Sequence, residues 1–304
     1  MSYFDQFVQD GKIRGRYDSE EILGLLLIIP ALLIILLTLV YPFLDAIRLS
    51  FYDIGTGTFV GIDNYQWLFG QDAFTGTVWR SFVWTVGNMA LQGAAGIGIA
   101  LLLNRAFFGR NAIRTIILIP FIVPTAVTAV MWRYLFNSSY GPINHYLVEF
   151  GLISEGVNPL AAGGLALATV ILINTWRWAP LVALVVLAVL QTIPREEYEA
   201  ARMEGASAID QFRHVTFPHL QNSMLILGLL GFLLTFNIFD MVWLLTEGGP
   251  SNATLTLPVY IYEIAFNLQS FGRAGAASIA LFGILVVFVF LYFQQEEFKE
   301  GDIA

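Results

Sequence analysis

Side chains suited to binding a small polar ligand gather in two apolar stretches of this 304-residue sequence. Ligand pockets combine aromatic surfaces with a few placed polar groups. The candidate residues are Asn174, Trp176, Arg177, Trp178, Asn237, Asp240 and Trp243. The sequence therefore predicts that these two stretches contribute to a binding site or pathway for a ligand.

Catalytic and metal-binding chemistry is less well supported. The histidines are His145, His214 and His219, and the last two are five apart across Pro218, a spacing that does not place two ligands on one helix face. Gly11-Lys12 is followed by isoleucine and lacks the upstream glycine of a phosphate-binding loop. With no cysteine, the chain has neither disulfide nor thiolate chemistry. We expect no cofactor in this chain.

Composition places the chain among membrane proteins. Hydrophobic residues make up 57% and charged residues 12%, whereas soluble domains carry about a quarter charged residues. The net charge of −8 argues against nucleic-acid binding, which needs clustered cations. A helix needs about 20 apolar residues to cross the lipid core. The segments that meet this length are 22–41, 81–103, 114–136, 164–190, 223–246 and 274–293.

The distribution of basic residues predicts the orientation of these spans. Ten of the 15 lysines and arginines fall in 1–21, 104–114, 191–222 and 294–304. Because short cytoplasmic loops are enriched in Lys and Arg, both termini should be cytoplasmic. We thus predict an all-α integral membrane protein with six transmembrane helices over 22–293, a cytoplasmic segment 1–21, a polar loop 191–222 and a tail 294–304.

Two of the candidate binding residues carry opposite charges. An arginine at the centre of a spanning helix costs roughly 2.5–3.5 kcal/mol, so Arg177 needs water or a partner, and Asp240 is a candidate partner. In the alternative interpretation these two form a structural ion pair, and the tryptophans anchor the chain at the membrane interface.

Small residues recur every four positions in two spans: Ala90, Ala94 and Gly98 in the second, and Gly272, Ala276 and Ala280 in the sixth. Such stripes let helices approach closely in lipid. We expect both to pack within one bundle, with a subunit interface as the alternative.

The polar loop 191–222 has the signals of two short helices. Pro194 suits a first helical position, and Gly205 suits the left-handed residue that ends a helix. A first helix is predicted over 194–204 and a second over 208–214, stopped before Pro218. The small side chains of Ala200 and Ala201 would let the first helix fit closely into a groove on another protein. A solvated loop without a partner is the alternative.

This loop resembles the EAA loop of ABC-importer permeases, in which Glu-Ala-Ala is followed by Gly and then by apolar-x-apolar-Pro. The matching residues are Glu199, Ala200, Ala201, Gly205, Val215 and Pro218, and Phe217 replaces the usual leucine. The resemblance implies a coupling helix that seats in an ATP-binding subunit. ATP and Mg²⁺ would then belong to an ATPase dimer made by another chain.

The segment 239–266 is similar to carbohydrate-uptake permeases of the maltose-permease type. The matching residues are Phe239, Asp240, Leu245, Thr246, Gly248, Gly249, Pro250, Thr254, Leu257, Tyr260, Tyr262, Ala265 and Phe266. The resemblance implies a prokaryotic cell-membrane protein that imports a carbohydrate, with glycerol phosphate or a related polyol derivative as the alternative substrate. Because sugars are bound by aromatic faces and polar side chains together, the candidate residues of the two stretches would form the sugar site. The partners of such a protein would be a second permease subunit, the ATPase dimer and an extracytoplasmic solute-binding protein.

Two other classes of function remain open from the residues alone. An ion-coupled secondary transporter would move substrate without other subunits, and it usually has more carboxylates within the membrane. An integral membrane enzyme would need a catalytic arrangement at one membrane face, which the sequence does not offer.

Overall fold

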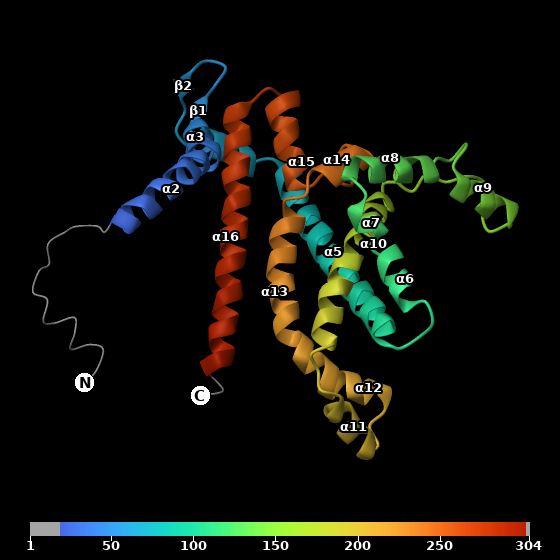
Figure 1. Ribbon diagram of the computed structural model, residues 1–304. Coiled ribbons are helices and arrows are strands. Elements are labelled where there is room, and N and C mark those ends of the chain that lie inside the picture. Colours follow the sequence, from blue (N-terminus) through green and yellow to red (C-terminus); the bar gives the residue numbers. More distant parts are fainter. Residues whose placement is uncertain (1–18, 302–304) are drawn as a thin grey trace, which may run out of the picture.

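The computed structural model describes the backbone of residues 19–301 and the side chains of residues 26–294. This part of the chain is mainly helical, with one short β-hairpin whose strands have two residues each (Figure 1). In chain order the elements are α2 Ser19–Ile35, a π turn Leu36–Val40, α3 Tyr41–Leu49, β1 Tyr52–Asp53, β2 Thr58–Phe59, α4 Asp63–Phe69, α5 Asp72–Asn104, α6 Arg110–Ile116, α7 Ile119–Ile122, α8 Thr125–Leu135, α9 Pro142–Glu149, α10 Ala166–Leu190, α11 Arg195–Met203, α12 Ala208–Gln211, a π turn Phe212–Thr216, α13 Phe217–Phe236, α14 Asp240–Thr246, α15 Leu257–Tyr262, a π turn Glu263–Asn267 and α16 Phe271–Gly301. Most of the predicted segment 1–21 lies outside the described residues, and α16 continues through much of the predicted tail 294–304.

The predicted membrane spans are present, and one of them is bent. Within the described residues, helices long and apolar enough to cross a membrane are Leu26–Leu49, Asp72–Asn104, Ala166–Leu190, Ala208–Phe236 and Phe271–Gln294. The predicted third span is instead a pair, Arg110–Ile122 and Thr125–Leu135, whose parts meet at 94°. Val123 is extended there because a residue before proline is disfavoured in the α region, and Pro124 follows it.

The predicted fifth span, 223–246, is also interrupted. Helix α13 ends at Phe236, the chain turns at Asn237, and the short helix α14 begins at Asp240. At its other end this helix begins earlier than predicted, because Pro218 does not stop it. Proline is tolerated in the first turn, where its missing N–H costs little, and a π turn joins α12 directly to α13.

Helices α5 and α10 lie against each other along most of their length in the centre of the bundle. Their close approach depends on Gly96, where an added Cβ would lie 2.5 Å from Val182 Cγ1. Ala90, Ala94 and Gly98 are exposed, so the prediction that this stripe packs within the bundle is wrong. Each stripe residue is two positions from the buried residues Asn88, Gln92, Gly96 and Ala100, so the stripe lies on roughly the opposite face of α5.

The small residues of α16 do pack within the chain, as predicted. An added Cβ at Gly272 would lie 2.1 Å from the carbonyl oxygen of Tyr52, and Ala276 is fully buried. Helix α16 therefore holds α3 and the β-hairpin close to the bundle.

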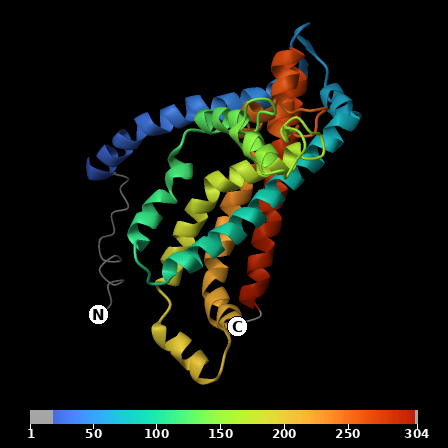
Figure 2. The same ribbon diagram turned by 90° about the vertical axis from the view of Figure 1, so that its right-hand side faces the viewer.

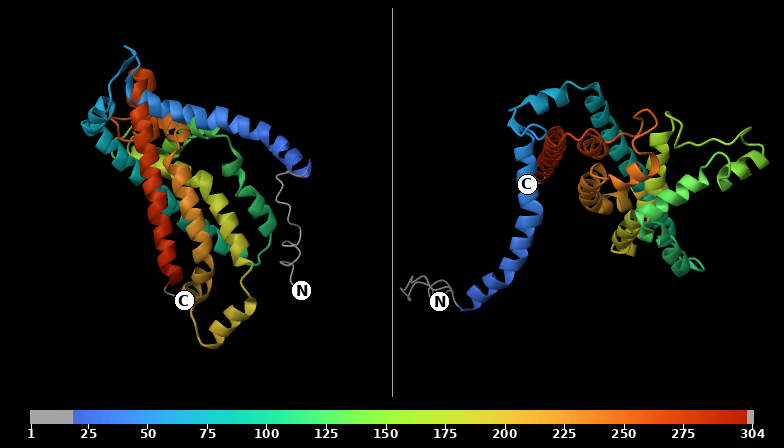
Figure 3. Two further views of the ribbon diagram at one scale, coloured as in Figure 1. Left: turned by 90° about the vertical axis from the view of Figure 1, so that its left-hand side faces the viewer. Right: turned by 90° about the horizontal axis from the view of Figure 1, so that it is seen from above.

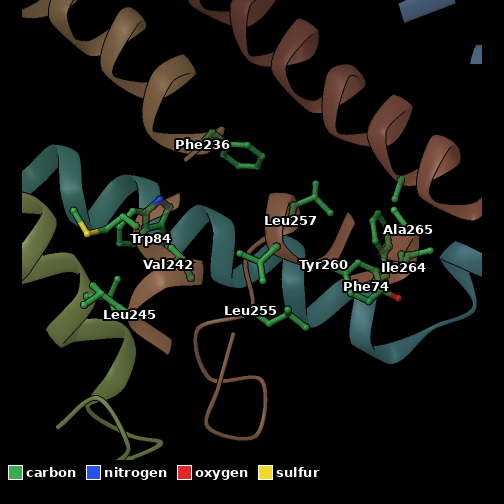
Figure 4. Close-up of a cluster of buried hydrophobic side chains, with 14 of the residues drawn as sticks. Phe74, Trp84, Phe236, Val242, Leu245, Leu255, Leu257, Tyr260, Ile264 and Ala265 are labelled. Atoms are coloured by element: carbon green, nitrogen blue, oxygen red, sulfur yellow. The ribbon is translucent and has the colours of Figure 1, made fainter. Parts of the chain in front are cut away.

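The main core joins α5, α13, α14, α15 and α16. Trp84 of α5 and Phe236 of α13 are completely buried in it, together with Leu257 of α15 (Figure 4). The indole N–H of Trp84 donates to the carbonyl oxygen of Thr235 at 2.9 Å. Since Thr235 lies in the last turn of α13, this bond fixes the point at which α13 breaks.

The two ends of the helical bundle differ in structure. Helices α11 and α12 project beyond the bundle at the same end as the C-terminal part of α16, and the β-hairpin lies at the other end (Figure 2). Helix α2 runs away from the bundle with its apolar side chains uncovered, and the 18-residue apolar window of this span is 0% buried (Figure 3). Over the side chains that the structure describes, α2 is therefore exposed on all its faces.

Candidate functional site

The polar loop begins with α11, as the sequence predicts, although Pro194 precedes the helix rather than opening it. Glu196 and Glu197 lie in the first turn and Arg202 in the last, which suits the helix dipole at both ends. The predicted helix 194–204 is thus observed as Arg195–Met203.

Gly205 ends α11 as predicted. Its φ is 83°, in the left-handed region that glycine adopts without strain. The N–H of Gly205 donates to the carbonyl of Arg202 at 3.0 Å, and that of Ala206 to the carbonyl of Ala201 at 2.9 Å. This pair of bonds is the Schellman motif, which satisfies carbonyls left free at a helix end.

The second helix of the loop starts at a capping box that the sequence analysis missed. The N–H of Asp210 donates to the Ser207 hydroxyl at 3.3 Å, and Ser207 N–H donates to the Asp210 carboxylate at 3.0 Å. Ser followed three positions later by an acid is the sequence signal for this cap. The turn between α11 and α12 is therefore held from both sides.

The loop is tied to the bundle beneath it. Val215 is buried among residues at the ends of α5, α10 and α13, and Ala201 and Tyr198 pack against that cluster. The hydroxyls of Tyr198 and Thr216 lie 2.9 Å apart, and His219 Nε2 lies 3.5 Å from a Glu197 oxygen. These contacts join α11 to the π turn before α13 and to the first turn of α13.

The opposite side of the loop is open. Glu199 and Ala200 are exposed, as is Pro218 at the start of α13. Met203 and Ile209 are 89% and 78% exposed, unusual for large apolar side chains at a polar tip. Glu199 makes no hydrogen bond or ion pair within the described chain. The loop thus presents the apolar side chains of Met203 and Ile209 together with the unpaired carboxylate of Glu199.

Among the predicted binding residues, Asn174 has a packing position. It is fully buried, and its amide N–H donates to Asn88 Oδ1 at 2.8 Å. Gln92 donates to the same oxygen at 3.1 Å. Asn174 is thus part of a buried polar cluster between α5 and α10. Asn88 and Gln92 were missed, although both are amides spaced four apart within a predicted span.

The neighbouring residues of α10 contact the bent third span. Trp176 packs edge-on against Trp132 of α8 with ring centroids 5.5 Å apart, and Trp178 packs similarly against Phe121 of α7 at 5.4 Å. The guanidinium carbon of Arg177 lies 5.4 Å from the centre of the Trp178 ring. This cation–π contact accounts for part of the cost of an arginine at this depth.

The remaining predicted residues lie where α13 breaks. Asn237 and Asp240 are exposed, and the Asp240 carboxylate accepts the N–H of Met241 at the start of α14. Trp243 stacks on Phe239 at 5.6 Å and contacts Tyr262 of α15 at 4.6 Å. Exposed polar groups therefore lie beside a row of aromatic rings.

The structure does not bring the two groups together. The suggested ion pair between Arg177 and Asp240 is absent from the described residues: the Asp240 carboxylate accepts the N–H of Met241, and Arg177 lies over Trp178. Only the group at the α13 break, Asn237, Asp240 and Trp243, combines exposed polar atoms with aromatic faces.

The chain matches known proteins over most of its length. Residues 92–296 match the family described as binding-protein-dependent transport system inner membrane component. A probable ABC transporter permease protein of Brucella suis is 34% identical over 88% of this chain and 93% of its own length. The trehalose/maltose transport system permease protein MalF of Thermococcus litoralis is 30% identical over 92% and 95%.

Solved structures agree on the fold. A bacterial ABC transporter involved in the import of the acidic polysaccharide alginate superposes with a TM-score of 0.82 at 20% identity, covering 91% of this chain and 96% of the other. The bent third and fifth spans, the protruding loop 191–222 and these matches lead to one conclusion. The chain belongs to the family of binding-protein-dependent transport system inner membrane components, the permease proteins of ABC transporters.

Proposed function

We propose that this chain is one of two permease subunits that form the pathway of a sugar-importing ABC transporter. The observation that carries the proposal is the open side of the loop 191–222, which is rigidly shaped and tied to the bundle. A loop held by a Schellman motif, a capping box and buried Val215 can transmit force. A solvated loop would need none of these.

The ATP-binding subunit docks on the exposed side of α11 and α12. Met203 and Ile209 are the anchors, since apolar side chains that fill pockets dominate such interfaces. Glu199 and Ala200 lie on the same open side. ATP and Mg²⁺ are held by that subunit, and closure of its dimer moves α13 through the π turn that follows α12.

The second permease covers helix α2 and the exposed stripe of α5. A lone apolar helix is stable in lipid, but a stripe of small residues favours close helix contact over lipid contact. Ala90, Ala94 and Gly98 form such a stripe, and it is exposed in the part of the chain that the structure describes. The pathway then lies between the two subunits.

The sugar binds beside the break in α13, on Asn237, Asp240 and Trp243. Broken backbone at membrane depth is tolerated where it lines protein or a water-filled cavity. Relatives support a carbohydrate, since one is a trehalose/maltose permease and another, from Agrobacterium fabrum, a sulfoquinovosyl glycerol permease. Asn174, Trp176, Arg177 and Trp178 hold α5, α7 and α8 around this pathway.

Orientation follows from the same arrangement. The end with α11 and α12 faces the cytoplasm with both termini, and the end with the β-hairpin faces outward, where a solute-binding protein delivers the sugar. The density of basic residues in 104–114 and 191–222 supports this orientation.

Reconstitution tests the proposal. The chain, its partner permease, the ATPase and the binding protein are placed in liposomes, and uptake of radiolabelled sugar is followed. We expect uptake to need ATP and the binding protein. Uptake by this chain alone, driven by an ion gradient, would replace the proposal with a secondary transporter.

A further inference from the structure

We propose that a cavity on the outer side of this permease binds an acidic saccharide, which gives the transporter an entry site for sugars that bear a carboxylate. The inference rests on the proposed sugar uptake. The cavity has a volume of ≈ 630 Å³. Its lining residues are Val130, Arg133, Tyr134, Asn137, Tyr140, Asn158, Leu160, Ala161, Leu245, Thr246, Gly249 and Pro250.

The cavity is built where the two broken spans meet. Helix α8 follows the 94° bend of the third span, and α14 follows the break at Asn237. The two short helices lie side by side towards the end opposite α11 (Figure 1). The loop after α8 and the segment around Asn158 complete the wall. A straight third or fifth span would leave no such space.

Two asparagines face the cavity with donors. Asn137 Oδ1 accepts the N–H groups of Ser139 and Tyr140 at 2.9 and 3.2 Å, and Asn158 Oδ1 accepts the N–H of Leu160 at 3.1 Å. Because a backbone N–H can only donate, each amide must turn its oxygen to the backbone. Neither NH₂ group has a hydrogen bond within the described chain. Both are free to donate to a ligand.

Arg133 adds the charge. Its Nη1 donates to the carbonyl oxygen of Leu244 at 3.3 Å, in the last turn of α14, which holds the side chain in place. The other guanidinium N–H groups are not used by the described residues. No Asp or Glu is among the lining residues that the structure describes. The cavity is therefore rich in donors and carries one uncompensated positive charge.

An aromatic wall completes the site. The rings of Tyr134 and Tyr140 have centroids 5.8 Å apart and are inclined by 38°. Aromatic faces pack against the C–H face of a sugar ring, while the guanidinium binds a carboxylate with two parallel hydrogen bonds. The volume suits a monosaccharide or disaccharide. A neutral sugar would leave the strongest donor without a charged acceptor.

Calorimetry on the assembled transporter, without ATP and without binding protein, tests the site. The probes are galacturonic acid and its neutral counterpart, galactose. We expect galacturonic acid to bind more tightly, and Arg133→Gln to weaken it by about tenfold or more, the loss of a charge-assisted hydrogen bond. Galactose binding should change little.

Two further variants keep the result interpretable. Asn158→Asp preserves the oxygen that accepts Leu160 N–H but replaces the donor with a negative charge, so it should weaken galacturonic acid binding with the fold intact. Arg48→Gln removes an outer arginine that is 68% exposed and paired with Asp45, away from the cavity lining, and should have no effect.

Equal affinity for the acid and the neutral sugar, or no effect of Arg133→Gln and Asn158→Asp, would overturn the proposal. So would variants that weaken capture of the binding protein but not of free sugar, since the cavity would then be a docking surface. If sugar import is observed without acid preference, the proposed function stands and this site falls. If acid binding is confirmed but no ATP-driven uptake occurs, the site stands and the proposed function falls.

Discussion

At the scale of single residues, Gly205 shows how one backbone conformation supports coupling. Nothing lies within 4 Å of an added Cβ, so only the left-handed φ of 83° opposes substitution. In that conformation a β-branched residue destabilises the loop by at least about 1–2 kcal/mol, whereas asparagine adopts it more readily. We expect Gly205→Val to reduce sugar-stimulated ATP hydrolysis several-fold and Gly205→Asn to preserve most of it. Equal loss in both would mean that the space, not the conformation, matters.

A substitution at Asn174 distinguishes a packing role from a sugar-binding role. Removing it leaves the shared acceptor, Asn88, with one donor fewer inside the bundle. Hydrogen bonds between membrane helices are worth roughly 0.6–1.7 kcal/mol, so Asn174→Ala should lower the Tm of the purified subunit while the KM for sugar stays unchanged. A raised KM at constant Tm would instead place Asn174 in the sugar site.

Asn237 should show the opposite result. Its side chain is exposed and donates to the Leu233 carbonyl at the end of α13. If it binds sugar, Asn237→Ala should raise the KM about tenfold, the loss of roughly one buried hydrogen bond, and leave the Tm near that of wild type. Uptake kinetics and thermal unfolding, measured on the same preparation, separate the two outcomes.

At the scale of elements, the contact between α5 and α10 depends on Gly96. Its Cβ would meet Val182 at 2.5 Å and the backbone nitrogen of Ala183 at 3.1 Å, whereas a Cβ at Gly98 meets nothing within 4 Å. Overpacking costs about 1–3 kcal/mol, so Gly96→Ala should destabilise the isolated subunit and Gly98→Ala should not. If Gly98→Ala instead reduces recovery of the second permease, the exposed stripe is that interface.

The lengths and positions of most elements could be predicted from the sequence. Apolar runs located the spans, and Pro194, Gly205 and the following polar residues located α11 and α12. The breaks were missed for a physical reason. Val123-Pro124 and Asn237 interrupt runs whose hydropathy stays high on both sides, and hydropathy does not report helix direction. The prediction that a helix stops before Pro218 was wrong, because the effect of proline depends on whether it lies in the first turn of a helix or in its interior.

At the scale of the whole molecule, the family could be predicted from the loop and the segment 239–266, and the comparisons confirm it. The exposure of the candidate binding residues could not be predicted from the sequence. A polar side chain within a span costs free energy in the lipid core. The sequence does not show whether such a side chain bonds to a neighbouring helix, as Asn174 does, or is exposed, as Asn237 is. That difference depends on helix rotation, which packing decides.

Recovery of the ATPase with the permease tests the central claim most directly. Tagged wild-type protein is purified in mild detergent beside a Met203→Glu, Ile209→Glu double variant. Both side chains are exposed, so the fold should not change, and two charges should abolish docking. Leu152→Glu, at the other end of the molecule and 69% exposed, serves as the control. We predict an ATPase and a second permease with wild type and control, and the second permease alone with the double variant. Equal ATPase recovery with all three proteins would contradict the assignment of this loop as the coupling element.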